Sequence, residues 1–353
     1  MNTTLKTFRA AGTLTLIAAL AACGGGGGGS TPTAPAAPGT PVAPTVVVVD
    51  SGTLHTSVSA STYGAGTLGD SAFTALNAAR QGAGAGLVSQ NIKIDVAAGA
   101  HAAYVQANGV THIEDSGKPG FYAASVSDRL IKAGFNSGFN TETIGGTGAS
   151  LQGRDCVLGL LNTVYHGVAL LSIATDVGFG FGLDAAGTPL CVTNPATVAG
   201  DSLGQVPAAG AFIAYPYSGQ QNVFETFYAG YETPRVPVSD FPNLTAGTPI
   251  IVSVRNADYL NFQAAGTLVA TVTAFNLKDA GGNLVPAGIL ALSGLNAGPG
   301  VTLIPDSNMR EGFVSLVPFS PLVKGQSYTA TFSATLKSGG PTMTKTWSFT
   351  TNP

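Results

Sequence analysis

Apolar residues recur at helical spacing through the middle of the chain. Between residues 70 and 163 they repeat every three or four positions, so that they share one face of an α-helix. The pattern predicts four helices, at residues 70–81, 95–108, 127–133 and 153–163. Asp95 has the side chain of an N-cap for the second of them. Strand-like runs follow at residues 168–173, 177–183, 190–192 and 211–215. Helices followed by strands, without a strict alternation of the two, indicate an α/β/α layered sandwich.

Beyond Pro234 the helical spacing disappears and apolar and polar residues alternate. Residues 268–274 and 328–336 follow this period of two, which is typical of strands with one buried face. The turn Ser338-Gly339-Gly340 separates the second run from a partner strand that carries Trp347, so we predict a C-terminal hairpin. Several such strands in succession indicate a β-sandwich. The closing pattern resembles the last strands of bacterial Ig-like modules, a resemblance that identifies a fold and not a function.

The first residues are typical of a secretion signal. Lys6 and Arg9 supply its positive charge, and residues 10–22 form an apolar stretch too short to span a membrane. The stretch ends in Leu-Ala-Ala before Cys23, which is similar to a bacterial lipobox; an ordinary cleaved signal with an incidental cysteine is the alternative. We interpret residues 1–22 as a lipoprotein signal peptide and Cys23 as the acylated membrane anchor. Because Gly24 is not acidic, we expect an exported protein of the outer membrane or cell surface.

Residues 23–49 contain the acylated cysteine and a flexible tether. A glycine run comes first, and a stretch rich in proline, alanine and threonine follows. Neither part has the apolar periodicity needed to bury a core. The tether would therefore hold the folded part away from the bilayer.

The charge of the chain excludes one class of partner. It has 15 basic and 18 acidic side chains, and loss of the signal would remove two of the basic ones. A net negative protein without basic clusters does not attract nucleic acid or anionic lipid by charge. We therefore expect no nucleic-acid partner.

Two cysteines remain besides Cys23. In an oxidising compartment Cys156 and Cys191 are expected to form a disulfide between the fourth predicted helix and a strand. Two buried thiols are the alternative, since sequence does not show whether the two residues lie close together.

Histidine and glutamate are concentrated in one part of the chain. The sequence contains four histidines and five glutamates, and two of each lie between residues 112 and 166. They are His112, Glu114, Glu142 and His166. Imidazole beside carboxylate offers either a proton carrier at neutral pH or a site for a divalent metal.

The order of these residues resembles the bacterial form of the CAP superfamily, which includes cysteine-rich secretory proteins, antigen 5 and pathogenesis-related proteins. The resemblance covers roughly residues 68–232 and begins with the helix that bears Asn77 and Arg80. It continues with the His112-Ile113-Glu114-Asp115 turn, Glu142 and the late His166. It implies an α+β protein: a CAP-type α/β/α sandwich at residues 50–235, followed by an all-β Ig-like sandwich at residues 236–353.

The resemblance also implies a cleft. Family histidines that correspond to His112 and His166 share a cleft and can hold a divalent metal, often zinc, with glutamates such as Glu114 and Glu142 alongside. The helix before His166 lacks the family's second cleft glutamate, and Gly167 stands where arginine is frequent. Because two histidines are too few for a closed zinc site, any metal should be exchangeable. The alternative is a hydrogen-bonded network that holds the helices on the sheet.

Three functions follow, in order of preference. The first is a non-enzymatic binding module for a small apolar ligand, a divalent metal or an envelope or host protein. The second is a metal-assisted hydrolase or protease that uses His112, His166 and Glu142. The third is a structural envelope protein with a vestigial cleft. We assign no catalytic residue, because the chain lacks a Gly-x-Ser-x-Gly elbow, a His-Glu-x-x-His pair and a phosphate-binding loop. His101 is expected to pack beside Tyr104 on the second helix.

Overall fold

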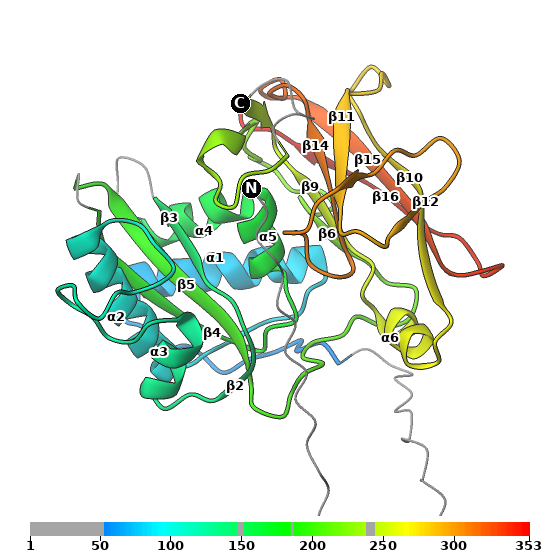
Figure 1. Ribbon diagram of the computed structural model, residues 1–353. Coiled ribbons are helices and arrows are strands. Elements are labelled where there is room, and N and C mark those ends of the chain that lie inside the picture. Colours follow the sequence, from blue (N-terminus) through cyan, green and yellow to red (C-terminus); the bar gives the residue numbers. More distant parts are fainter. Residues whose placement is uncertain (1–52, 147–151, 185–186, 238–243) are drawn as a thin grey trace, which may run out of the picture. The chain divides into compact units, whose positions relative to one another are not determined.

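The computed structural model describes residues 53–146, 152–184, 187–237 and 244–353 (Figure 1). The predicted signal peptide, Cys23 and the whole of the tether lie outside these residues. Helices and strands are both well represented, which confirms the mixed α+β class. Among the described residues, no helix has both the length and the apolar character needed to cross a membrane.

Five helices lie among the described residues up to residue 170; the first four are close to the predicted positions, and the fifth was not predicted. They are α1 (Leu68–Ala83), α2 (Ile92–Asn108), α3 (Val126–Lys132), α4 (Gly153–Leu161) and α5 (Val164–Leu170). The N-cap predicted for α2 is wrong. Asn91 caps the helix by accepting a hydrogen bond from the Lys93 backbone N–H at 3.2 Å. Asp95 lies one turn further on, where its carboxylate accepts from Gln90 Nε2 at 2.7 Å and from the Phe179 backbone N–H at 2.9 Å.

The predicted strand at residues 168–173 is also wrong. The chain turns at Asn162 and Thr163 and enters α5, which includes His166 and ends at Leu170. Val168, Leu170 and Leu171 are buried in the hydrophobic core. A short, fully buried helix shows a continuous apolar run, which periodicity alone does not distinguish from a strand.

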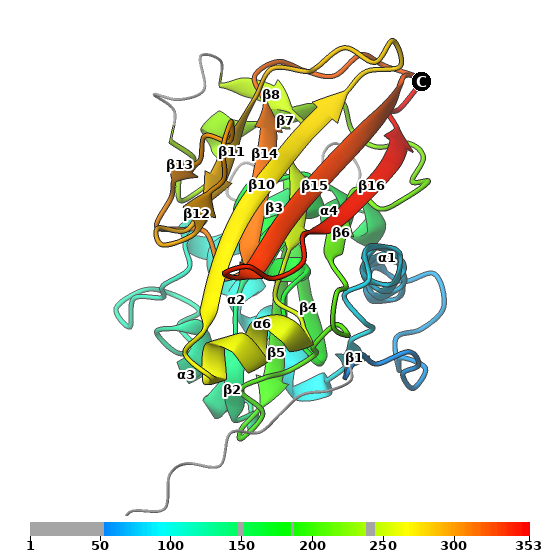
Figure 2. The same ribbon diagram turned by 90° about the vertical axis from the view of Figure 1, so that its right-hand side faces the viewer.

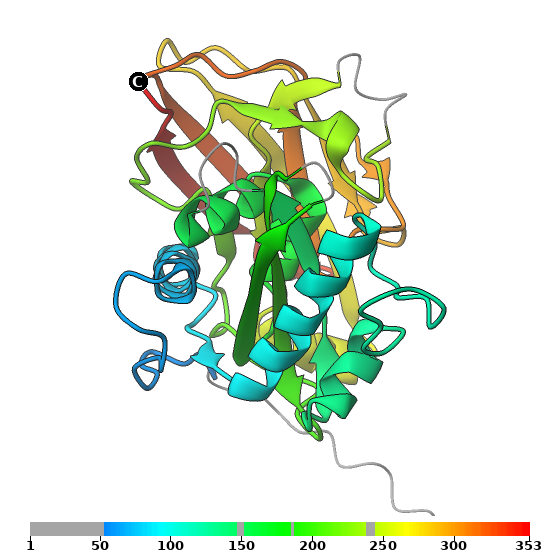
Figure 3. The same cartoon turned by 90° about the vertical axis from the view of Figure 1, so that its left-hand side faces the viewer.

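The described residues before β6, which we call the first half, contain one sheet with helices on both faces. Its strands are β1 (Ser89–Gln90), β2 (Ser137–Asn140), β3 (Thr143–Gly146), β4 (Asp176–Leu183) and β5 (Pro189–Val198). The order is β1-β4-β5-β2, with β3 also paired to β5, and β1–β4 is the parallel pair. The helix α2 crosses one face of β4 and β5 (Figure 3). On the other face, Val177 and Phe179 of β4 belong to the core that α1, α4 and α5 form.

Glycines on β4 explain how closely α2 approaches the sheet. Successive residues of a strand point to opposite faces, so Gly178 and Gly180 both face α2. A Cβ atom at Gly178 would lie 2.4 Å from the Asp95 backbone nitrogen, and one at Gly180 would lie 2.2 Å from the Ala98 carbonyl oxygen. The helix backbone therefore lies directly on the strand.

The described residues from β6 to the C-terminus, which we call the second half, contain two larger sheets, a two-stranded sheet and one short α-helix. The first sheet has the order β13-β11-β14-β9-β6 and the second has the order β12-β10-β15-β16, which Figure 2 shows face on. The strands of the first are β6 (Ile213–Tyr215), β9 (Ile250–Ser253), β11 (Ala287–Ala291), β13 (Ile304–Pro305) and β14 (Phe313–Pro318). Those of the second are β10 (Leu268–Lys278), β12 (Asn296–Ala297), β15 (Ser327–Lys337) and β16 (Met343–Thr350). Residues 327–334 pair with residues 343–350, so the predicted C-terminal hairpin is confirmed.

Shorter elements complete the second half. They are β7 (Thr226–Tyr228), the 3₁₀ turn η1 (Ala229–Tyr231), β8 (Thr245–Gly247) and α6 (Ala257–Ala264). The sequence pattern did not predict α6. Its N-cap is Asn256, whose side chain accepts from the Tyr259 N–H at 3.0 Å. Tyr259 and Leu260 anchor the helix in the core of the two sheets.

One strand on the N-terminal side of the predicted domain boundary, at residues 235 and 236, belongs to a sheet on its C-terminal side. Strand β6 pairs antiparallel with β9, so residues 213–215 do not lie in the sheet of β4 and β5. One hydrophobic cluster also joins Leu161 of α4 to Ile251 of β9. The hydrogen-bonded sheets of the second half thus begin at β6, and the limits 50–235 and 236–353 stay a prediction about domains.

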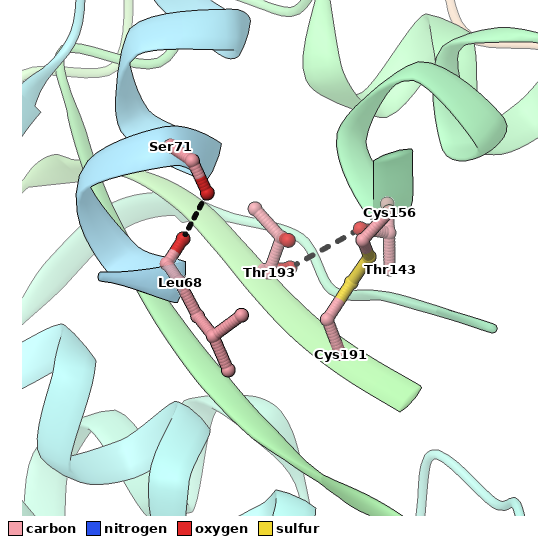
Figure 4. Close-up of a disulfide and its surroundings, with 6 residues drawn as sticks. All are labelled: Leu68, Ser71, Thr143, Cys156, Cys191 and Thr193. Atoms are coloured by element: carbon pink, nitrogen blue, oxygen red, sulfur yellow. Dashed lines mark hydrogen bonds between the residues drawn. A yellow bond between two sulfur atoms is a disulfide. The ribbon is translucent and has the colours of Figure 1, made fainter. Parts of the chain in front are cut away.

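The disulfide expected between Cys156 and Cys191 is confirmed. It links α4 to β5, and the two Cα atoms lie 6.4 Å apart (Figure 4). Both residues are fully buried in the hydrophobic core. The bond therefore fixes α4 on the sheet immediately before α5 begins.

Removal of this disulfide should lower the free energy of unfolding by about 3–4 kcal/mol, the value expected for a closed loop of this length. Urea denaturation of the Cys156→Ser/Cys191→Ser chain would measure the change. As a control, a reducing agent should lower the stability of the parent chain and leave that of the double variant unchanged. Two reactive thiols in the unfolded, non-reduced chain carrying Cys23→Ser would contradict the assignment.

Candidate functional site

An arginine on α3 lies at the centre of the predicted site. Arg129 is buried, and its Nη2 donates to the two carboxylate oxygens of Glu142 at 2.9 and 2.7 Å. Its Nη1 lies 3.6 Å from Glu114 Oε1. The same guanidinium donates to the His112 carbonyl oxygen at 3.3 Å. Arg129, which the sequence analysis did not select, thus holds two of the predicted site residues together.

Glu142 accepts two further hydrogen bonds. His112 Nδ1 lies 3.0 Å from Oε1, and Asn194 Nδ2 donates to Oε2 at 3.1 Å. Burial by itself raises the pKa of Glu142, but the His112 hydrogen bond and the nearby His101 and Arg129 outweigh burial and hold that pKa below its ordinary value. Glu142 is therefore a buried carboxylate anion with both oxygens occupied.

Glu114 is also buried, but it faces α2. Its Oε1 lies 2.8 Å from His101 Nδ1, and its Oε2 accepts from the backbone N–H groups of Tyr122 at 2.6 Å and Ala123 at 3.2 Å. The other nitrogen of His101 lies 2.8 Å from the Thr111 carbonyl oxygen. Both nitrogens of His101 therefore face oxygen atoms. These bonds fasten the turn at residues 111–123 to the helix.

His101 packs as predicted and also joins the network. Its ring stacks on Tyr104, with centroids 6.1 Å apart and an interplanar angle of 9°. Its Nε2 lies 3.4 Å from Glu142 Oε1. His101 is fully buried, so it contacts the other site residues from the protein interior and does not reach the surface.

His112 is the exposed member of the group, with 43% of its side chain accessible. Because Nδ1 faces the Glu142 carboxylate, that nitrogen carries a proton in either state of the ring, whereas Nε2 accepts a hydrogen bond in the neutral ring and donates one in the protonated ring. No described residue makes a hydrogen bond to Nε2.

His166 lies on α5 and is 14% exposed. Its Nδ1 lies 2.9 Å from Thr163 Oγ1, which itself donates to the Leu160 carbonyl oxygen at 3.0 Å. The threonine oxygen therefore accepts from Nδ1–H, and Nε2 is again the nitrogen with a free lone pair. Burial and the nearby charge of His112 lower the pKa of His166 to about 4, so the ring is neutral at neutral pH.

The sequence analysis missed a glutamate beside His166. Glu232, which follows η1, is buried, and its Oε1 lies 3.5 Å from His166 Nδ1. The two oxygens accept from the backbone N–H groups of Val164 at 3.1 Å and Tyr165 at 2.6 Å, so this side chain caps α5. Burial raises the pKa of Glu232 to about 7. Since burial moves both groups toward their neutral forms, their contact is polar and not a full ion pair.

The donor set does not fit a resident metal. Among the residues that the structure describes, no group of three or more histidine, cysteine, aspartate or glutamate side chains could hold an ion. The carboxylates of Glu114 and Glu142 are occupied, which leaves one nitrogen each on His112 and His166. Zinc takes three or four protein ligands, so the metal role assigned to these two histidines stays a prediction without support from the geometry.

Two pockets lie away from these histidines. One of about 400 Å³ is lined by residues of the second half, among them Leu284 and Tyr328. Another of about 220 Å³ lies beside α1 and α4, where Ala79, Leu158 and Tyr215 line it. Neither is lined by His112 or His166.

Comparisons with known proteins do not place the chain in a family. Neither the protein-family models nor the curated proteins give a match. Among solved structures, an outer surface protein from Borrelia burgdorferi is similar at 16% identity and a TM-score of 0.30, over 36% of this chain and 89% of that one. A likeness at this level carries no argument about fold or function.

Proposed function

We propose that this protein is an exported, lipid-anchored binding module of the cell envelope. In this proposal residues 50–235 are a CAP-type domain, residues 236–353 are an Ig-like domain, and Cys23 carries the anchor at the outer membrane or cell surface. Helices on both faces of one sheet, with His112 bonded to Glu142, support the first part. The two sheets of the second half support the second part.

We prefer binding to hydrolysis because the carboxylates of Glu142 and Glu114 are already hydrogen-bonded. A hydrolase that activates water with a glutamate needs a carboxylate lone pair free to take the proton. The oxygens of Glu142 accept from Arg129, His112 and Asn194. Those of Glu114 face His101 and two backbone N–H groups. A base built on either glutamate would first have to break this network.

The surface around His112 suits a protein partner. Val110 and Ile113 are 66% and 61% exposed, and with His112 they form what we call the His112 face. Exposed apolar side chains around a polar group are typical of protein-binding surfaces. The exposed Nε2 of His112 would form a hydrogen bond with a polar group of the partner. A small apolar ligand would need an enclosing pocket, and neither pocket described above lies at this face.

Site-specific photo-crosslinking tests this proposal. A photo-reactive amino acid in place of Val110 or Ile113, in cells that make the full chain, should give one discrete adduct with an envelope protein. The same amino acid in place of Val323, which is 62% exposed and remote in sequence, should not give that adduct. His112→Ala should reduce the adduct without lowering the amount of protein.

Two results would overturn the proposal. One is the same adduct at position 323, which would mean that crosslinking reports only exposure. The other is turnover of a peptide or ester substrate that His166→Ala abolishes, which would make the protein a hydrolase.

A further inference from the structure

The corner between α4 and α5 carries His166 and receives contacts from segments much later in the chain. We call residues 162–167 the α4–α5 corner. Glu232 already provides one such contact, because it caps α5 through the backbone N–H groups of Val164 and Tyr165. Three further residues of the corner, Asn162, Tyr165 and Gly167, contact segments between residues 226 and 306.

Asn162 fastens the beginning of the corner. Its Nδ2 donates to the Thr226 carbonyl oxygen in β7 at 2.6 Å. Its Oδ1 accepts from the Thr248 hydroxyl, just after β8, at 2.9 Å. The amide therefore joins the end of α4 to two segments of the second half.

Tyr165 links the middle of the corner to Asp306, which directly follows β13. Its hydroxyl donates to Asp306 Oδ2 at 2.6 Å, and the other oxygen of this buried carboxylate accepts from the Asn308 N–H at 2.9 Å. Burial and the Asp306 carboxylate raise the pKa of Tyr165 well above its ordinary value, so the hydroxyl keeps its proton. A hydrogen bond from a hydroxyl to a carboxylate is among the stronger kinds in proteins.

The residue that follows His166 lies against β9. A Cβ atom at Gly167 would be 2.5 Å from Ile251 Cδ1 and 3.1 Å from the Leu161 carbonyl oxygen. A larger residue at this position, such as the arginine that is frequent in the family, would displace the Ile251 side chain or the corner at Leu161. Glycine here allows that side chain of β9 to pack directly on the helix that bears the imidazole.

We infer that the β-sheets of the second half position His166 and so form part of the site. Tyr165 and Asp306 are positioning residues, because they fix the peptide that precedes His166 from the side of the sheets. The second half is then a structural component of the site and not a spacer. The expectation that a displaced His166 weakens partner binding rests on the proposed function. The inference that the sheets position His166 does not.

Histidine NMR tests the positioning directly. The chain has four histidines, so spectra of the ¹³C,¹⁵N-histidine-labelled full chain contain four sets of ring signals, which single-histidine variants assign. Tyr165→Phe removes the hydroxyl alone, and Asp306→Asn keeps the shape of its partner. Each should shift the ring signals of His166 more than those of the other three histidines. Each should also weaken the crosslink of the His112 face.

Tyr328→Phe is the matched control. The Tyr328 hydroxyl is likewise hydrogen-bonded, accepting from the Val323 N–H at 2.8 Å, but it lies within the second half. This variant should leave the His166 signals unchanged. Unchanged His166 signals in both Tyr165→Phe and Asp306→Asn would overturn the inference. Shifted His166 signals in the two variants, together with no crosslink at the His112 face of the wild-type protein, would retain the inference and reject the proposed function.

Discussion

Arg129→Met should lower the free energy of unfolding by about 3–5 kcal/mol, the cost of removing one partner from a buried ion pair. The substitution leaves Glu142 and Glu114 buried without the guanidinium that lies between them. Methionine fills much of the same volume, so the loss reports charge and hydrogen bonding more than a cavity. Urea denaturation at pH 7 would measure it.

Arg154→Met provides the control for Arg129. Arg154 pairs with Asp155 at 3.7 Å, but its side chain is 64% exposed. Exposed ion pairs contribute little, so this variant should stay within about 0.5 kcal/mol of the parent. If the two methionine variants lost the same free energy of unfolding, the buried network would not stabilise the fold.

The pH dependence of stability should change in opposite directions when His166 and Glu232 are substituted. Burial lowers the pKa of His166 from 6.5 to about 4, so on acidification the unfolded chain takes up a proton that the folded chain refuses. His166 thus makes the protein less stable as pH falls from 6.5 toward 4. Burial raises the pKa of Glu232 from 4.5 to about 7, so the folded chain keeps a proton that the unfolded chain releases. Glu232 thus makes the protein more stable as pH falls from 7 toward 4.5.

The two contributions oppose each other between pH 4.5 and 6.5. Each slope approaches about 1.4 kcal/mol per pH unit midway between the folded and unfolded pKa values of its group. Relative to the parent chain, Glu232→Gln should lose stability on acidification through this range, and His166→Asn should gain it. Urea denaturation at three pH values in that range, expressed as variant minus parent, removes the effect of the other titrating groups. Slopes of the same sign in the two variants would refute the assignment.

The sequence predicted best the elements whose pattern is local. The spacing around Leu76 gives α1, and the alternation around Phe332 gives β15, because each element buries one face against the rest of the protein. The apolar run around Leu170 was misread, since a buried helical turn and a buried strand look alike over so few residues. Helix α6 was missed because its signal is a single N-cap, Asn256, in a segment dominated by strands.

The candidate site was predicted only in part, because the sequence shows residue types and their order but not the contacts between separate segments. His112 and Glu142 were selected from their residue types and order, and the structure brings them together. Arg129 and Glu232 were not, because their roles arise from contacts between distant segments. Glu232 reaches α5 from a position 67 residues after Tyr165. No local pattern in Tyr231-Glu232-Thr233 indicates such a partner.

The disulfide also decides which residues can carry mechanical load. Tension applied between the two ends of the chain passes from Cys156 to Cys191 through the covalent bond and bypasses the 35-residue separation between them. Fully extended, that segment would add roughly 120 Å to the length of the chain. It includes α5 and β4, and therefore His166. While the bond is intact, a pull that unravels the rest of the chain cannot stretch out this part of the site.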